Sequence, residues 1–163
     1  EAVKDKEFPE LPRFGIRMFL NKKMNEVTYF GMGPQESYRD KHQASCHGLF
    51  RSKVAQMHED YIRPQENGSH YDCDYVEITS GQYGIAAVSN DSFSFNVSVY
   101  TQEELERALH NYELEESDST VFCMDYAMNG IGSNSCGPDV LDKYRFAEEA
   151  FRFQFELIPF VKG

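Results

Sequence analysis

The chain has 163 residues, a formal net charge of −11 at pH 7 and 40% hydrophobic residues. This length suits one domain with a buried core, and the 13 Phe and 10 Tyr exclude a disordered chain. The negative charge excludes a nucleic-acid binder, because phosphate recognition needs clustered Lys and Arg, and it favours an uncharged ligand. No segment approaches the roughly 20 apolar residues that span a bilayer, and the N-terminus lacks the apolar run of a signal peptide.

Alternation of apolar and polar residues predicts a succession of β-strands. Such alternation places every second side chain on one buried face of a sheet. In the first half of the chain, strands are expected over residues 14–20, 26–30, 50–57, 72–79 and 84–88. Turn-forming residues separate them, notably at 66–69 and at 89–92.

The second half of the chain continues this pattern around one helix. Strands are expected over residues 93–99, 120–128 and 151–157. Between them, Thr101 and Glu104 form a capping box, and apolar residues follow at helical spacing up to Tyr112. Many short strands with one helix indicate an all-β antiparallel sandwich rather than alternating βαβ units. No repeat or linker divides the chain, so residues 1–163 are expected to form a single domain.

The four cysteines show no metal-binding spacing. We interpret Cys46, Cys73, Cys123 and Cys136 as free thiols of a reducing compartment, with two disulfides as the alternative. A zinc site at His42, Cys46 and His47 would need a second closely spaced ligand pair, which the sequence lacks. No metal site is therefore predicted.

Two loops each place a glutamate beside aromatic residues. Glu36 follows the strand 26–30, and Glu66 follows Tyr61. A glycosidase requires two such carboxylates, one of them as acid or base. The alternative is structural: both carboxylates bind loop amides and balance Arg17, Arg39 or Arg63. We favour the structural interpretation and predict no catalytic residue in this chain.

A third loop, residues 128–139, is rich in Gly, Ser and Asn. A dinucleotide-binding motif would need a helix that begins within it, but Pro138 and Asp139 follow instead. Cys136 lacks a neighbouring base that could activate it as a nucleophile. The glycines permit close backbone approach, so the loop is expected to face a ligand.

These same loops carry a family resemblance. The chain resembles the C-terminal small-chain domain, the fifth domain, of bacterial β-galactosidases of glycoside hydrolase family 2. The resemblance rests on five motifs that occur in the family's order: residues 29–38, 61–68, 93–96, 100–105 and 130–138. Together they extend over nearly the whole chain from Phe14 onward.

The resemblance implies a twisted β-sandwich of the galactose-mutarotase-like supersandwich class. It implies a parent enzyme that hydrolyses terminal non-reducing β-D-galactosides, including lactose, with retention of configuration. The catalytic glutamates of the family lie in a barrel domain outside this chain, as do the expected Mg²⁺ and monovalent cation. The family domain also begins before Glu1, so N-terminal strands are expected to be missing here.

The resemblance also assigns roles to loop residues. The third loop would reach the edge of the parent's active site through Ser133, Asn134, Ser135 and Cys136. Some family members have a sugar-stacking Trp where this chain has Cys136. The remaining loop residues would be structural: Glu36, Arg63, Glu66 and Asn67.

The expected partners are the galactoside substrate, the other β-galactosidase domains and further copies of the parent in a homo-oligomer. Nucleic acid and membrane are not expected as partners, and the expected location is the cytoplasm or, alternatively, the periplasm. Two other functions stay open on the sequence alone: a free-standing carbohydrate-binding module and a mutarotase-like enzyme. The enzyme would need a carboxylate and one of the histidines at a sugar: His42, His47, His58, His70 or His110.

Overall fold

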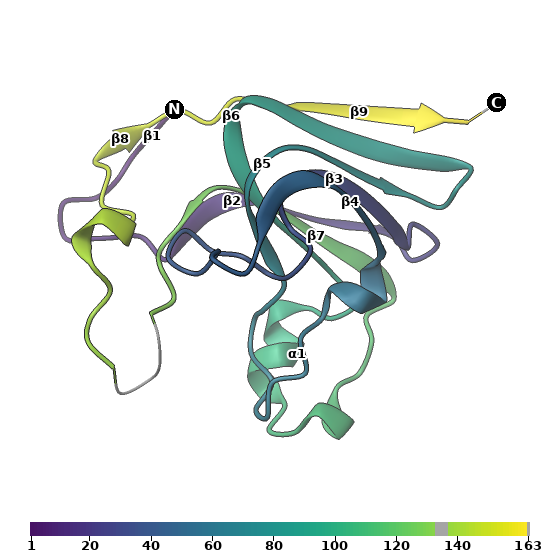
Figure 1. Cartoon of the computed structure of the whole chain (residues 1–163), viewed down its shortest axis with the longest axis horizontal. Helices are drawn as coiled ribbons and strands as arrows, with labels where there is room; N and C mark the ends of the chain where they lie inside the picture. The colour runs from purple at the N-terminus through teal and green to yellow at the C-terminus, as the bar shows by residue number, and fades with distance from the viewer. Residues whose placement is uncertain (133–136, 163) are drawn as a thin grey trace.

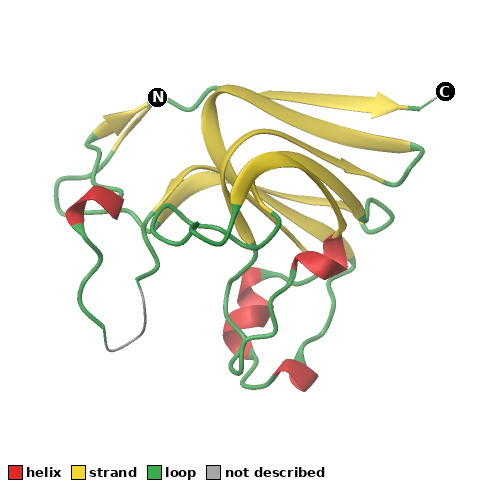
Figure 2. Cartoon of the chain, in the orientation of Figure 1, coloured by secondary structure: helices red, strands yellow, loops and turns green. Residues whose placement is uncertain are grey.

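A computed structural model describes residues 1–132 and 137–162 of the chain (Figure 1). Nearly all regular structure in these residues is β-strand, with one α-helix (Figure 2). The strands are β1 (Ala2–Val3), β2 (Arg13–Asn21), β3 (Glu26–Gly33), β4 (Cys46–Lys53), β5 (Ser69–Thr79), β6 (Tyr83–Ser98), β7 (Ser119–Met128), β8 (Ala150–Phe151) and β9 (Glu156–Val161). The helix is α1 (Gln102–Arg107), and the 3₁₀ turns are η1 (Val54–Met57), η2 (Asn111–Glu113) and η3 (Asp142–Tyr144).

One long strand, β6, organises the main sheet. Seven strands pair in antiparallel fashion, in the order β2-β7-β6-β5-β3-β4 with β9 added on β6. The second half of β6 pairs with β7, from Ser94 to Ser98, whereas its first half pairs with β9, from Tyr83 to Val88. The sheet therefore curls over itself into two layers, and β3 and β5 arch over β2 and β7 (Figure 1).

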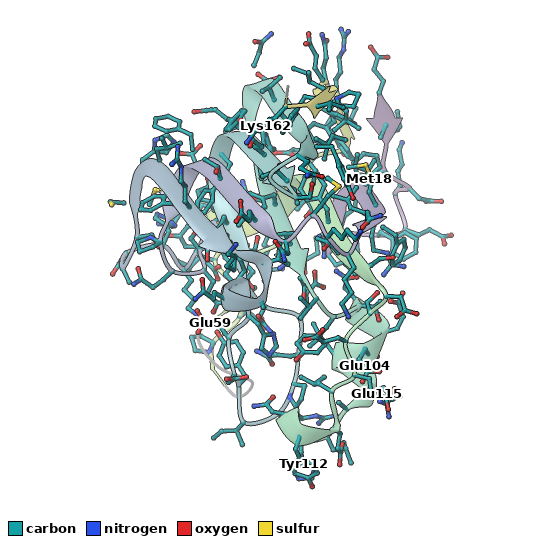
Figure 3. The ribbon with its side chains drawn as sticks, turned by 90° about the vertical axis from the view of Figure 1, so that its right-hand side faces the viewer. Met18, Glu59, Glu104, Tyr112, Glu115 and Lys162 are labelled. Carbon is teal, nitrogen blue, oxygen red and sulfur yellow. The ribbon has the colours of Figure 1, made fainter. Side chains whose placement is uncertain are left out.

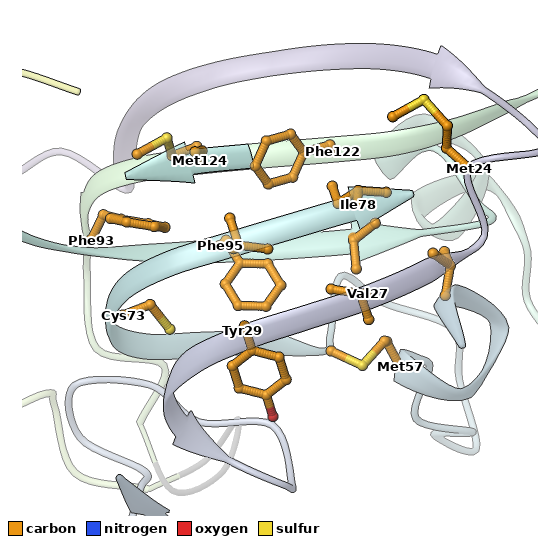
Figure 4. Close-up of a cluster of buried hydrophobic side chains, with 14 residues drawn as sticks. Met24, Val27, Tyr29, Met57, Cys73, Ile78, Phe93, Phe95, Phe122 and Met124 are labelled. Atoms are coloured by element: carbon orange, nitrogen blue, oxygen red, sulfur yellow. The ribbon is translucent and has the colours of Figure 1, made fainter. Parts of the chain in front are cut away.

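The core fills the space between these layers (Figure 4). Phe122 and Met124 of β7 and Phe95 of β6 supply one side, and Val27 and Tyr29 of β3 supply the other. Every one of these five side chains is almost completely buried. The all-β class, the antiparallel pairing and the single short α-helix predicted from the sequence are confirmed within the described residues.

Three predictions about the strands are wrong. The strands expected over 84–88 and 93–99 are one strand, because β6 runs through the turn expected at 89–92. The strand expected over 50–57 ends at Lys53, because Val54–Met57 turn into η1 and bury Val54 and Met57. The strand expected over 151–157 is interrupted, since β8 pairs with β1 while β9 pairs with β6. Between β8 and β9, Phe153 and Phe155 still pack against the core, which explains why apolar and polar residues keep alternating through the interruption.

The predicted helix begins where its capping box indicates. The Thr101 hydroxyl accepts a hydrogen bond from the Glu104 backbone N–H at 3.1 Å. The helix is shorter than expected, because extended backbone at Ala108 ends it and Tyr112 is left 83% exposed at the tip of the molecule (Figure 3). The Glu104 side chain accepts a hydrogen bond from the Glu115 backbone N–H, which holds the segment after the helix against α1.

The described cysteines, Cys46, Cys73 and Cys123, are free thiols, as the sequence indicated. Among residues 1–132 and 137–162, the structure contains no helix that is long and apolar enough to cross a membrane.

Replacement of Phe95 by Ala tests the central position of the core. Phe95 packs against Tyr29 and His70, with ring centroids 5.1 and 5.2 Å apart. Because the change leaves a cavity, we expect the free energy of unfolding to fall by about 3–5 kcal/mol in urea titrations. The control is Phe19→Ala on β2, where the ring is 55% exposed and the loss should be much smaller. Equal losses in the two variants would contradict the two-layer core.

Candidate functional site

The three loops singled out in the sequence are connected to one another. The first loop, residues 34–45, joins β3 to β4, and the second, residues 58–68, leads from η1 into β5. The third, residues 129–149, joins β7 to β8 and is described here outside 133–136. Two carboxylates of the first loop, Glu36 and Asp40, make the connections.

Glu36 joins the first loop to the second. Its side chain is buried, and Oε2 accepts hydrogen bonds from the Gly68 backbone N–H at 2.8 Å and from the Tyr38 hydroxyl at 3.3 Å. Oε1 accepts from the Lys41 ammonium and from the Tyr61 hydroxyl. Four donors therefore occupy this carboxylate, and few acceptor positions are left for a ligand.

These donors determine the protonation state of Glu36. Burial opposes ionisation, but the hydrogen bonds from Lys41, Tyr61 and Gly68 outweigh it and hold the pKa of Glu36 below its ordinary value. Burial and the Glu36 carboxylate together raise the pKa of Tyr61, so this phenol keeps its proton. Glu36 is therefore an anion near neutral pH and is poorly suited to donate a proton as a general acid.

Asp40 joins the first loop to the third. Its carboxylate accepts hydrogen bonds from the backbone N–H groups of Ile131 at 3.1 Å and Gly132 at 2.8 Å. Gly130 packs so closely against it that an added Cβ would lie 2.9 Å from the Asp40 carboxylate and 2.8 Å from Val140. A side chain at position 130 would therefore displace the loop from its anchor.

Glu66 is held from outside the loops by Arg13 of β2. The Arg13 guanidinium donates to Glu66 and also makes a two-pronged contact with Asp125 of β7, including Nε to Oδ1 at 3.1 Å. Asp125 is only 2% exposed, and burial raises the pKa of its carboxyl while Arg13 opposes that rise. Gly15 lets the strands approach here, because a Cβ on it would collide with Asp125 and the Met124 carbonyl.

The cations that meet the two glutamates differ from those expected. Lys41 pairs with Glu36 and Arg13 pairs with Glu66, whereas Arg17 pairs with Glu103. Arg39 donates to the Arg145 carbonyl instead, and Arg63 is exposed to solvent. Arg13 was not expected because β2 lies more than forty residues before Glu66 in the sequence, whereas Lys41 stands only five residues after Glu36.

Asn67 fixes the end of the second loop. Its Oδ1 accepts a hydrogen bond from the Glu59 backbone N–H at 2.9 Å, and its Nδ2 donates to the Gln65 carbonyl at 2.9 Å. The Asn67 carbonyl accepts from the Asn96 side chain of β6. The predicted ligand-facing residues Ser133, Asn134, Ser135 and Cys136 lie outside the described residues.

A cleft of about 1020 Å³ lies where the loops meet. Tyr38, Lys41, Tyr61 and Glu66 line it from the first two loops, and Leu141 and Tyr144 are among its residues from the third. Aromatic rings beside polar groups suit an uncharged polar ligand better than an ion. Sequence reasoning missed Asp40 and Lys41, which stand two and three residues after the first motif, and it gave no role to Tyr61, which opens the second motif.

No histidine is among the described residues that line the cleft where the loops meet. His42 contacts the Tyr38 carbonyl, His47 lies near Asp74, and His110 pairs with Glu113 on the surface. Burial lowers the pKa of His70 to about 4, so His70 is neutral near pH 7. No group of three or more His, Cys, Asp or Glu among the described residues is placed to hold a metal ion.

Comparison with known proteins gives a consistent answer. The family model described as "Beta galactosidase small chain" matches residues 1–157. β-Galactosidase of Actinobacillus pleuropneumoniae is 50% identical over 157 residues, which are 96% of this chain and 15% of that protein. The β-galactosidase of Staphylococcus xylosus is 41% identical over 96% of this chain and 16% of its own length. The β-galactosidase of Kluyveromyces lactis is 33% identical over 91% of this chain and 14% of its own length. The chain thus spans about 15% of the length of these relatives.

Replacement of Glu36 by Gln tests the junction between the loops. The amide keeps the shape but removes the charge that Lys41, Tyr61 and Gly68 stabilise, so unfolding should become easier by about 2–3 kcal/mol at pH 7. Because the pKa of Glu36 is lower in the folded chain than its unfolded value of 4.5, the ionised carboxylate stabilises the fold fully above pH 4.5. This stabilisation is lost as the pH falls through the pKa of Glu36 in the folded chain. The difference between wild type and variant, measured by urea denaturation, should therefore shrink below pH 4.5.

The matched control is Glu26→Gln, which removes an exposed glutamate that pairs with Lys53. Exposed pairs contribute little, so its stability should stay close to that of the wild type. A Glu36→Gln variant as stable as this control at pH 7 would contradict a structural role for Glu36.

Proposed function

We propose that this chain, which belongs to the β-galactosidase small chain family, is the non-catalytic C-terminal β-sandwich of a β-galactosidase. The parent would hydrolyse terminal non-reducing β-D-galactosides such as lactose. Relatives that carry the name β-galactosidase match along 96% of this chain, and the chain matches only a small part of each. The reaction is therefore assigned to the parent and the supporting role to this segment.

One observation carries the non-catalytic assignment. Both candidate carboxylates are occupied by protein groups: Glu36 by four donors, and Glu66 by Arg13. A retaining glycosidase needs one carboxylate free to attack the sugar and a second that gives up a proton. Glu36, which four donors occupy, meets neither requirement, so the pair of carboxylates that the two loops offered is incomplete.

The resemblance implies Mg²⁺ and a monovalent cation for the parent. Mg²⁺ requires several oxygen ligands, and the described residues offer no cluster of three or more metal-binding side chains. We therefore assign Mg²⁺ and the monovalent cation to the barrel domain of the parent. The other domains of the parent and further copies of it are the proposed partners, and the cytoplasm is the proposed location.

The proposed contribution of this domain to the active site is its third loop. Asp40 holds the near end of that loop through the Ile131 and Gly132 amides, and the cleft of about 1020 Å³ opens beside it. The loop would then contact the outer sugar or leaving group through 133–136, while the barrel cleaves the galactosyl bond.

The purified 163-residue chain tests the first part of the proposal. It should not hydrolyse nitrophenyl β-galactoside, because Glu36 and Glu66 are engaged in structural contacts. Hydrolysis above the buffer rate that persists through purification, and that disappears in Glu36→Gln or Glu66→Gln, would show that the chain itself is catalytic.

Asp40→Ala in the full-length parent tests the second part. Loss of two charge-assisted hydrogen bonds should loosen the third loop and raise KM for lactose about 5- to 20-fold. The kcat should change less than about twofold, because a contact made equally in ground and transition states affects KM alone. Asp118→Ala removes an exposed carboxylate elsewhere and serves as control. A fall in kcat with unchanged KM would contradict the proposal.

A further inference from the structure

The main sheet is split along β6. Pairing with β7 stops at Ser94 opposite Asp125, and pairing with β9 starts only at Val88 opposite Glu156. Residues 89–93 therefore pair with neither strand on this side. On the other side, Cys73 of β5 pairs with Phe93 and Tyr75 pairs with Val88, so the register shifts twice between His70 and Tyr75 and residues 89–92 have no partner on β5. Such bulges redirect side chains and are frequent next to binding sites.

A pocket of about 580 Å³ lies at this split, where the unpaired stretch of β6 faces residues of β5 and β7. Tyr71 of β5 and Tyr126 of β7 contribute aromatic rings, and the buried Phe93 belongs to its lining. Its volume lies within the range of small-molecule sites. Tyr126 is held in place by Phe151, whose ring is stacked on it with centroids 4.8 Å apart.

Polar groups of this pocket are available to a ligand. Among the described residues, the buried Ser69 hydroxyl has only the Met128 sulfur as a side-chain partner, at 3.6 Å, and a thioether is a weak acceptor. Asp72 adopts a left-handed backbone with φ of 55°, which is costly for a residue other than glycine and is often found at functional sites. The exposed Asn90 and Asp91 add further hydrogen-bonding groups at the rim.

The charges of the pocket select against ions. Two guanidinium groups, of Arg39 and Arg152, stand beside three carboxylates, of Asp72, Asp91 and Glu148. The mixture would repel part of a phosphate or a polyanion. A metal ion fits no better, because these carboxylates form no metal-binding cluster in the described part of the chain. Donors and acceptors of both kinds beside aromatic rings are suited to a compact ligand with many hydroxyl groups.

We propose that the split in the sheet is a second sugar-binding site, which takes a neutral mono- or disaccharide between Tyr71 and Tyr126. The carboxylates of Asp72 and Asp91 accept hydrogen bonds from sugar hydroxyls, and the guanidinium groups and the Ser69 hydroxyl donate to sugar oxygens. This site goes beyond the proposed role of the domain in the β-galactosidase. It does not depend on whether the parent cleaves galactosides.

Titration of the ¹⁵N-labelled chain with galactose and with lactose, followed by NMR, tests this site. Amide signals of residues 71–72 and 90–94 should shift in a saturable manner. Asp91→Asn alters an exposed side chain without disturbing the core and should weaken the apparent affinity about tenfold, as expected for one charge-assisted hydrogen bond. Asp118→Asn, an exposed carboxylate away from the pocket, should bind as the wild type does.

Tyr71→Ala should weaken sugar binding to a similar extent, because it removes an aromatic wall of the pocket. If Tyr71→Ala folds poorly, Asp91→Asn still tests the site. Galacturonate and inorganic phosphate should shift the same signals far less than galactose. The proposal is overturned by the absence of saturable shifts, by tighter binding of the anions, or by shifts confined to Lys41 and Tyr61 of the neighbouring cleft.

Discussion

The change of partner along β6 is the constraint from which the rest of this structure follows. A single 16-residue strand keeps β5 on one side but exchanges β9 for β7 on the other. This exchange lets one sheet supply both layers of its own core, so that Phe95 and Phe122 face Val27 and Tyr29. It also leaves residues 89–93 without a strand on one side. The same change of partner along β6 therefore produces both the two-layer core and the unpaired, polar stretch at residues 89–93.

Loops at the edge of this curled sheet cannot pack through apolar side chains alone, and two carboxylates, the buried Glu36 and the half-buried Asp40, connect them instead. Glu36 satisfies the Gly68 amide and Asp40 satisfies two amides of the third loop. Buried backbone groups need such partners, because an unpaired one costs about as much as a lost hydrogen bond. The glutamates in these motifs therefore have a sufficient structural explanation without any role in bond cleavage.

The sequence was informative wherever local pattern and burial agree. Strict alternation located β2 to within one residue at each end, shorter apolar segments located β3 and β7 to within three residues, and the capping box located the start of α1. Pairings between distant segments were not readable, since nothing near Glu66 indicates Arg13. The turn residues at 89–92 were recognised, yet β6 runs on through them while its neighbour changes. That outcome depends on β9, which lies more than sixty residues further along the chain.

The two buried carboxylates respond to pH in opposite directions, and this follows from their environments. Four donors surround Glu36 and lower its pKa, so the folded chain loses stability there as pH falls below the ordinary value. Burial dominates at Asp125 and raises its pKa, so the folded chain binds a proton there more readily than the unfolded chain does. Mild acid consequently favours the native state at Asp125 and opposes it at Glu36. The strand pair β2–β7, through Arg13 and Asp125, and the loop junction at Glu36 therefore respond to acid as separate elements of the same chain.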